Sequence, residues 1–382
     1  MKATPVIETE EALQGLTRAL EAAPEIGVDT ESNSFYNYHE RICLLQFSTP
    51  EDDYIVDPLA FQNLDLLAPI FASPTVQKIF HAAENDILLL KKHHGFKIVN
   101  VFDTLLAAQI LGYREVGLGS LLDRVLSIQI DKGEQRSDWA RRPLSPDQIA
   151  YAARDTHYLI PLRDKLTGEL SARKRVGPAK EEFRRLAAKE PVERRPDPMA
   201  YLKVKGVRAL APDRRGVAQT LFEWREKTAS ELDRPPFRVL TNDALIELAR
   251  LAPRTWENLG RIRGVTPRVI SRFGDELLEG IRRGLQEGEK APPKSERRKQ
   301  RPRELWTDDM EARFQRLRDW RNRRAEALQV EPFIVASNRL LEQLAREAPD
   351  TIETLRTISD IGDWRIEDYG AEILDALREP RP

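Results

Sequence analysis

Cysteine is almost absent from this 382-residue chain, and its single cysteine, Cys43, excludes an intramolecular disulfide. Long hydrophobic runs are also missing, since no apolar segment approaches the ~18 residues of a membrane-spanning helix. The first residues, Met1–Pro5, lead into acidic residues and contain no apolar signal region. One cysteine and five histidines offer no cluster for zinc. We therefore expect a cytoplasmic, globular protein with no membrane partner and no disulfide partner.

A near-neutral net charge of −1 conceals two halves of opposite sign. Residues 1–170 carry 16 Lys and Arg against 25 Asp and Glu, a balance of −9. Subtracting these from the 61 basic and 62 acidic residues of the whole chain leaves 45 and 37, a balance of +8. An acidic half suits metal binding and a basic half attracts polyanions, although uneven surface charge explains the same division.

The acidic half contains a short apolar run, Ile26–Val28, that ends in Asp29-Thr30-Glu31. Side chains at positions i and i+2 of a strand share a face and lie ~6–7 Å apart along it. Asp29 and Glu31 should therefore project together, where a divalent cation can bridge them. An acidic loop after a strand is the alternative explanation of this pair.

Two later segments add carboxylates. Asp86 lies where a predicted buried strand (76–80) gives way to a predicted helix (84–94). Tyr151 and Asp155 are four residues apart in a helix predicted over 147–166, so they share one helical face. Each segment has a structural explanation of its own, and it is the ordered set that is specific.

Strand and helix patterns alternate in residues 5–170, which indicates an α/β class with a mixed sheet covered by helices. Beyond Ser171, Arg, Lys, Glu and Pro become abundant and we expect only helices. This part repeats itself at an offset of 96 residues. The repeat pairs Leu221–Arg225 with Leu317–Arg321, Pro236-Phe237 with Pro332-Phe333, Ala252-Pro253 with Ala348-Pro349, and Phe273-Gly274 with Tyr369-Gly370.

The ordered carboxylates resemble the exonuclease superfamily named for its Asp-Glu-Asp-Asp residues, in the branch with a tyrosine in the third motif. Further segments resemble the ribonuclease D family: Leu44–Phe47, Phe102–Thr104, Ser137–Trp139 and Arg142–Leu144. The two helical copies resemble the helicase-and-RNase-D C-terminal (HRDC) domain. The resemblance implies a ribonuclease H-like exonuclease domain (1–170), a helical connector (171–204), a first HRDC domain (205–287), a basic linker (288–303) and a second HRDC domain (304–382).

The resemblance also implies the chemistry. Two divalent ions, Mg²⁺ or Mn²⁺, suit an all-carboxylate site and can activate water and stabilise the leaving oxygen of a phosphodiester. Asp29, Glu31 and Asp155 would hold the ion that activates water, and Asp29 and Asp86 the other. Tyr151 would hydrogen-bond the attacking water, because the position that carries histidine in the sister branch is Ala150.

Four residues are candidates for substrate binding: Gln46, His81, Trp139 and Arg142. Trp139 and Arg142 could stack on and clamp an RNA 3′ end, although a core role for Trp139 is an equal alternative. Asp103 is acidic but fits better as a helix N-cap.

We expect a metal-dependent 3′→5′ exoribonuclease that releases nucleoside 5′-monophosphates, and the resemblance implies trimming of tRNA precursors and other structured RNA. A DNA exonuclease of the same superfamily and a non-catalytic RNA-binding scaffold are the rival interpretations. The oligomeric state stays open.

Overall fold

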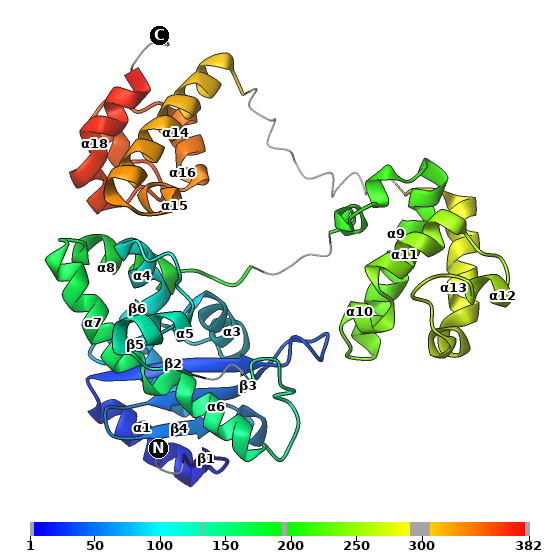
Figure 1. Cartoon of the computed structure of the whole chain (residues 1–382), viewed down its shortest axis with the longest axis horizontal. Helices are drawn as coiled ribbons and strands as arrows, with labels where there is room; N and C mark the ends of the chain where they lie inside the picture. Colours follow the sequence, from blue (N-terminus) through cyan, green and yellow to red (C-terminus); the bar gives the residue numbers. More distant parts are fainter. Residues whose placement is uncertain (1–3, 131–132, 193–196, 291–305, 379–382) are drawn as a thin grey trace. The chain divides into compact units, whose positions relative to one another are not determined.

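The computed structural model describes residues 4–130, 133–192, 197–290 and 306–378. The chain divides into two compact units (Figure 1). The first comprises Met1–Glu31, Ile42–Pro191 and Glu304–Pro382, and the second comprises Ser32–Arg41 and Val192–Arg303. The first unit therefore combines an N-terminal α/β domain with the second helical copy, whereas the first helical copy groups with a loop of the α/β domain.

A six-stranded mixed sheet forms the centre of the α/β domain, in the order β1-β4-β3-β2-β5-β6. Strands β3 and β4 form an antiparallel hairpin, and β2, β5 and β6 run parallel to one another. The carboxyl ends of these three parallel strands therefore meet at one edge of the sheet. The strands are β1 (Val6–Ile7), β2 (Glu25–Ser32), β3 (Ile42–Ser48), β4 (Asp53–Val56), β5 (Gln77–Phe80) and β6 (Val101–Asp103).

Helices cover both faces of this sheet. On one face, Leu45 and Phe47 pack with helices α1, α2 and α3; on the other, Leu44 packs with α6, and Ile79 with α4, α7 and α8. The consecutive residues Leu44 and Leu45 thus enter different cores, as the two-residue period of a strand requires. The helices are α1 (Glu10–Ala22), α2 (Ala68–Ala72), α3 (Glu84–His94), α4 (Thr104–Leu111), α5 (Leu118–Leu121), α6 (Pro146–His157), α7 (Leu159–Ala172) and α8 (Val176–Ala187).

The α/β class with a mixed sheet is confirmed, and two local predictions need correction. The helix predicted over 147–166 ends at His157, and a second helix begins at Leu159, because Tyr158 leaves the helical conformation. The alternating pattern also predicts a strand over 97–102, but strand β6 begins only at Val101 and ends at Asp103, and the two-residue strand β1 was not predicted. Most of the basic linker predicted at 288–303 lies outside the described residues.

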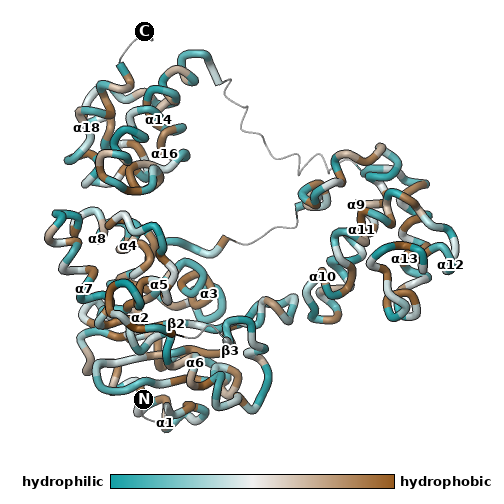
Figure 2. Tube along the Cα trace, in the orientation of Figure 1, coloured by the Kyte–Doolittle hydropathy of each residue, from teal (hydrophilic) through white to brown (hydrophobic). Residues whose placement is uncertain are grey.

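The two helical copies repeat their elements at the predicted offset of 96 residues. A buried arginine of the first helix binds the start of the third in both: Arg225 Nη1 donates to Asn242 Oδ1 (2.8 Å), and Arg321 Nη1 to Asn338 Oδ1 (2.6 Å). Apolar and hydrophilic stretches alternate along the helices of each copy (Figure 2). The first copy contains α9 (Pro212–Glu231), α10 (Pro236–Val239), α11 (Asn242–Leu251), α12 (Trp256–Leu259) and α13 (Pro267–Glu287); the second contains α14 (Asp308–Leu328), α15 (Pro332–Val335), α16 (Asn338–Glu347), α17 (Ile352–Arg356) and α18 (Asp363–Arg378).

Among the described helices, none combines the length and the apolar character that a membrane crossing requires.

Candidate active site

Three of the predicted carboxylates meet at the carboxyl-terminal end of β2. The strand enters the core with Ile26 and Val28, both fully buried, and then carries the half-buried Asp29 and Glu31. One carboxylate oxygen from each of Asp29, Glu31 and Asp155 lies within 4.8 Å of the others. The structure thus brings together three side chains that the sequence placed on two distant elements.

A close approach of α6 to the sheet brings Asp155 to this position. A Cβ atom on Gly27 would lie 2.8 Å from the backbone oxygen of Thr156, so only glycine fits at this point of β2. The Ser48 hydroxyl of β3 donates to Asp53 Oδ1 and therefore accepts from Thr156 Oγ1, at 2.6 Å in both cases, and the second contact ties the helix to the neighbouring strand. Sequence reasoning missed this role of Gly27, since an apolar run with one glycine does not reveal which backbone passes over it.

Tyr151 lies one helical turn before Asp155, as the four-residue spacing predicted. Its ring is largely buried, with its centroid 6.0 Å from that of Trp139, and its hydroxyl lies close enough to the Asp155 carboxylate that each group shifts the pKa of the other. A Ser145–Gln148 capping box begins the helix and satisfies its first amides. The phenol is therefore held against the carboxylate cluster by a well-anchored helix.

Asp86 lies in the first turn of α3, 7% exposed, and its carboxylate is held by a different partner. The Thr30 hydroxyl donates a hydrogen bond to Asp86 Oδ1. Asp86 does not belong to the group of three within 4.8 Å, yet its charge raises the pKa values of Asp29 and Glu31. Thr30 was not predicted, although its place between Asp29 and Glu31 was the available signal.

Asp103 holds the turn that leads into α3. It is the N-cap of α4, as predicted, and accepts from Leu106 N at 3.0 Å. Its carboxylate also accepts from the backbone N–H groups of Ala82 (3.3 Å) and Ala83 (2.7 Å), and Ala82 has a left-handed φ of 62°. A left-handed alanine is strained and persists only where neighbouring groups hold it. Here the Asp103 carboxylate holds the turn and thereby orients the helix that carries Asp86.

Burial and mutual repulsion dominate the electrostatics of the cluster. Burial, and then the charges of Asp155 and Asp86, raise the pKa of Glu31 to about 9. Burial raises the pKa of Asp155 to about 7 and that of Asp86 to about 6, and it also raises the pKa of Asp29 well above its ordinary value. Burial and the nearby carboxylates raise the pKa of Tyr151, so the phenol stays protonated.

This donor set fits divalent metal ions. Hard cations such as Mg²⁺ and Mn²⁺ prefer carboxylate oxygens, and the site offers three within 4.8 Å of one another. Among the described residues, no Lys or Arg forms an ion pair with any of the four carboxylates. Buried anions without a paired cation are costly, and a bound divalent cation would relieve that cost.

Three of the predicted substrate-binding residues have structural surroundings of their own: two are buried, and the third is engaged in hydrogen bonds within the domain. Gln46 is fully buried and Trp139 is 1% exposed, which argues against direct contact with a substrate. Arg142 binds Asp57 through Nη2 (2.7 Å) and Nε (2.5 Å) and donates to the backbone oxygens of Trp139 and Cys43. Arg142 therefore links the 137–144 segment to the sheet.

His81 is the candidate that stays compatible with substrate contact. Burial lowers the pKa of its imidazole to about 4, so the ring is neutral near pH 7. The Thr104 hydroxyl donates to Phe80 O (3.1 Å) and therefore accepts from His81 Nδ1–H (2.9 Å). This arrangement leaves His81 Nε2 as a hydrogen-bond acceptor.

Comparison with known proteins places this fold and site in a class. Residues 5–171 match the 3′-5′ exonuclease family, and residues 214–281 and 310–377 each match the HRDC domain. The chain is thus a 3′-5′ exonuclease, a hydrolase, followed by two HRDC domains.

Full-length relatives identify the family. Ribonuclease D of Gluconacetobacter diazotrophicus is 31% identical over 98% of this chain and 93% of its own, and that of Pseudomonas paraeruginosa is 30% identical over 97% and 96%. The catalytic core of RRP6 from Trypanosoma brucei superimposes with a TM-score of 0.69 at 30% identity, over 75% of this chain and 81% of its own. The chain belongs to the ribonuclease D family.

Proposed function

We propose that the protein is a metal-dependent 3′→5′ exoribonuclease that releases nucleoside 5′-monophosphates. The observation that carries the proposal is the convergence of Asp29, Glu31 and Asp155 within 4.8 Å beside the buried Tyr151. Clustered carboxylates of this kind serve phosphodiester hydrolysis with two divalent ions, in which one ion lies near the attacking oxygen and one near the leaving oxygen. The expected cofactors are Mg²⁺ or Mn²⁺.

Each carboxylate has a proposed role. Asp29, Glu31 and Asp155 would hold one ion, and Asp29 and Asp86 the other. When bound, the ions would supply a hydroxide-like nucleophile and stabilise the charge that develops on the leaving oxygen. Thr30 would hold Asp86 in place through its hydrogen bond.

Tyr151 would orient the attacking water as a neutral phenol. Its raised pKa prevents it from acting as a general base near pH 7, so its contribution is the position of its hydroxyl. Burial of the ring against Trp139 and the four-residue spacing from Asp155 hold that hydroxyl at the edge of the carboxylate cluster.

RNA is the proposed substrate, in particular the 3′ ends of tRNA precursors and other structured RNA. Its support is the family, since relatives at 30–31% identity are named ribonuclease D. The basic balance of residues 171–382 would attract the phosphate backbone and give binding that weakens with salt. His81 Nε2 is a suitable acceptor for a substrate hydroxyl such as the 2′-OH, which distinguishes RNA from DNA.

The test is digestion of one RNA oligomer labelled at its 5′ end or at its 3′ end, with Mg²⁺, with Mn²⁺ and with EDTA. We expect a ladder shortening from the 3′ end, nucleoside 5′-monophosphates as product, and no turnover in EDTA. Asp155→Asn should abolish turnover, whereas Asp147→Asn, the same change on an exposed residue of the same helix, should retain it. Turnover that persists in EDTA or in Asp155→Asn would contradict the metal assignment.

A DNA oligomer of matched sequence separates the rivals in the same assay. Preference for DNA would support a DNA exonuclease, and absence of turnover on both polymers with intact RNA binding would support a scaffold protein.

A further inference from the structure

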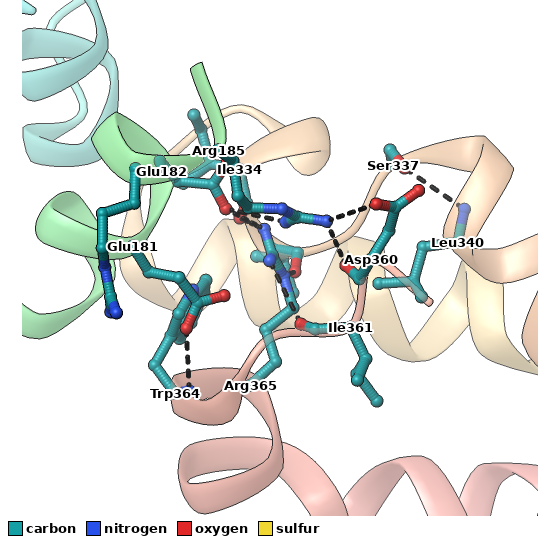
Figure 3. A network of polar contacts seen from close by, with 12 residues as sticks. Glu181, Glu182, Arg185, Ile334, Ser337, Leu340, Asp360, Ile361, Trp364 and Arg365 are labelled. Atoms are coloured by element: carbon teal, nitrogen blue, oxygen red, sulfur yellow. Dashed lines mark hydrogen bonds and ion pairs between the residues drawn. The ribbon is translucent and has the colours of Figure 1, made fainter. Parts of the chain in front are cut away.

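The second HRDC copy is seated on helix α8 by a buried arginine. Arg365, whose side chain is 5% exposed, extends from the start of α18 and donates to Glu182 Oε1 of α8 at 2.8 Å (Figure 3). Its Nε donates to the backbone oxygen of Val335 at 2.8 Å, so one guanidinium joins α8, α15 and α18. Removing one partner of a buried pair is costly, which makes this contact selective.

Neighbouring groups extend the contact along α8. The Arg185 guanidinium donates to the backbone oxygen of Asp360 and lies 3.4 Å from its carboxylate (Figure 3). The buried Glu181 accepts from the backbone N–H of Trp364 at 3.3 Å. Gly362 has a left-handed φ of 78°, and a Cβ atom there would displace the Glu181 carboxylate from its present position.

The turn between α14 and α15 makes a second part of the same interface. Arg175 Nη2 donates to the backbone oxygen of Leu328 at 3.0 Å, and Ile334 packs against the core shared by α4, α7 and α8. The backbone oxygen of Gln329 occupies the space that a Cβ on Gly112 would need. Glycine at 112 thus allows the turn to approach the end of α4 closely.

The first HRDC copy uses the equivalent turn, and its partner is a loop of the α/β domain. Asp233 Oδ1 accepts from the backbone N–H groups of Tyr38 (3.0 Å) and His39 (2.9 Å), and Oδ2 accepts from Asn37 Nδ2 (2.8 Å). The Arg238 guanidinium lies over the Tyr36 ring, 4.8 Å from its centroid. The loop, Ser32–Arg41, begins directly after Glu31 in the chain.

The contacting positions coincide under the 96-residue offset. Asp233 corresponds to Gln329, and both have a left-handed φ, of 46° and 53°. Arg238, which contacts Tyr36, corresponds to Ile334, which packs against the α4, α7 and α8 core. Two copies of one fold therefore use the same turn for contact, the first with the 32–41 loop of its own unit and the second with the end of α4 and with α8.

We propose that this turn, residues 230–239 in the first copy and 326–335 in the second, is a protein-docking face of the repeat. Its partners are the 32–41 loop for the first copy and the α4–α8 surface for the second. RNA contact by the repeats then falls to their remaining faces. The statement that the turn docks on protein is independent of the proposed function. The statement that RNA binds the other faces of the repeats rests on the proposed function.

Four residues of the α8 contact differ between the two copies. Asp360, Gly362, Trp364 and Arg365 correspond to Gly264, Thr266, Arg268 and Val269 in the first copy. A valine at the position of Arg365 has no charge for Glu182, and Thr266 has a φ of −83° where Gly362 has 78°, so the backbone also differs at this point. The two copies are consequently not interchangeable.

Amide hydrogen exchange of the full-length chain tests docking of the first copy. The amides of Tyr38 and His39 donate to Asp233, so Asp233→Ala should speed their exchange by about tenfold or more, as loss of a hydrogen bond to a charged group predicts. Asp243→Ala, on an exposed residue of α11, should leave both amides protected. Equal exchange in wild type and Asp233→Ala would overturn docking of this copy.

Two neighbouring arginines of α8 provide the matched pair for the second copy. Arg185→Glu places a carboxylate beside Asp360 and should speed exchange over 332–335 and 360–366 by about tenfold. Arg184→Glu makes the same charge change on an exposed residue that lines a separate cavity of the α/β domain. This variant should exchange the same two segments at the wild-type rate. Identical exchange in the two variants would overturn the α8 contact.

Adding a structured RNA to wild type tests the RNA part with the same readout. We expect RNA to protect other segments of the repeats and to leave Tyr38, His39 and 332–335 unchanged. Faster exchange at Tyr38 and His39, or new protection across the turn, would mean that RNA uses the docking face and would overturn this part. RNA without effect on any repeat segment would count against the repeats as RNA-binding elements, while docking would stand on the RNA-free measurements.

Discussion

Asp155→Asn should make the metal-free protein more stable at pH 8 and remove its response to Mg²⁺. The substitution preserves shape, and the new side-chain amide keeps a carbonyl oxygen that can accept a hydrogen bond. It removes one of three carboxylates whose oxygens lie within 4.8 Å of one another. Two unit charges ~5 Å apart repel by about 3 kcal/mol at an effective dielectric constant of ~20.

The pKa of Asp155 sets the pH window. Burial raises it from 3.8 to about 7, so the folded state binds more protons than the unfolded state between these values. The protonated Asp155 carboxyl group therefore contributes its full share to the free energy of unfolding below about pH 4, and this contribution is lost as the pH rises through about 7. At ~1.4 kcal/mol per pH unit, the loss has an upper bound of about 4 kcal/mol, and we expect Asp155→Asn to recover about 2–4 kcal/mol at pH 8.

Thermal unfolding followed by circular dichroism at pH 4 and pH 8 measures this effect in EDTA. For a domain of this size we expect the Tm of Asp155→Asn to exceed that of wild type by roughly 5–10 °C at pH 8 and to match it at pH 4. Saturating Mg²⁺ should then raise the wild-type Tm, since binding at 100 times Kd contributes about 2.7 kcal/mol, and should raise that of the variant much less.

Asp147→Asn, on the same helix but exposed, controls for the amide substitution and should follow wild type throughout. A variant less stable than wild type at pH 8 in EDTA would refute the repulsion argument. An equal Mg²⁺ response in the two proteins would refute Asp155 as a ligand.

Three further substitutions test the supports of the site. Tyr151→Phe should lower kcat by about 10²–10⁴-fold with little change in RNA affinity, and a loss confined to KM would make Tyr151 a packing residue. Thr30→Val removes the hydrogen bond to Asp86 and should raise the Mg²⁺ concentration for half-maximal activity by about tenfold, as for partners of metal ligands; an unchanged value would count against this role. Gly27→Ala should displace α6 and lower kcat by up to about 10²-fold, and full activity would show that the close contact is not needed.

The sequence by itself determined the elements that carry the site and the repeat behind it. Asp29 and Glu31 share a strand face because of the two-residue period, and Tyr151 and Asp155 share a helical face because of the four-residue spacing. The 96-residue offset located both HRDC copies, whose matched ranges obey the same offset. These features are local or repetitive, so they can be recognised without knowledge of distant contacts.

Only the tertiary structure decided how these elements meet. The bare Cα of Gly27 lets α6 approach β2, Thr30 reaches Asp86 across 56 residues of sequence, and Trp139 lies in the interior. The turn around Asp233 contacts the 32–41 loop and the equivalent turn around Gln329 contacts the end of α4, although the two residues share no chemistry beyond a left-handed φ. Periodicity determines which face of an element a side chain occupies, whereas the distance between elements depends on the packing of residues far apart in the chain.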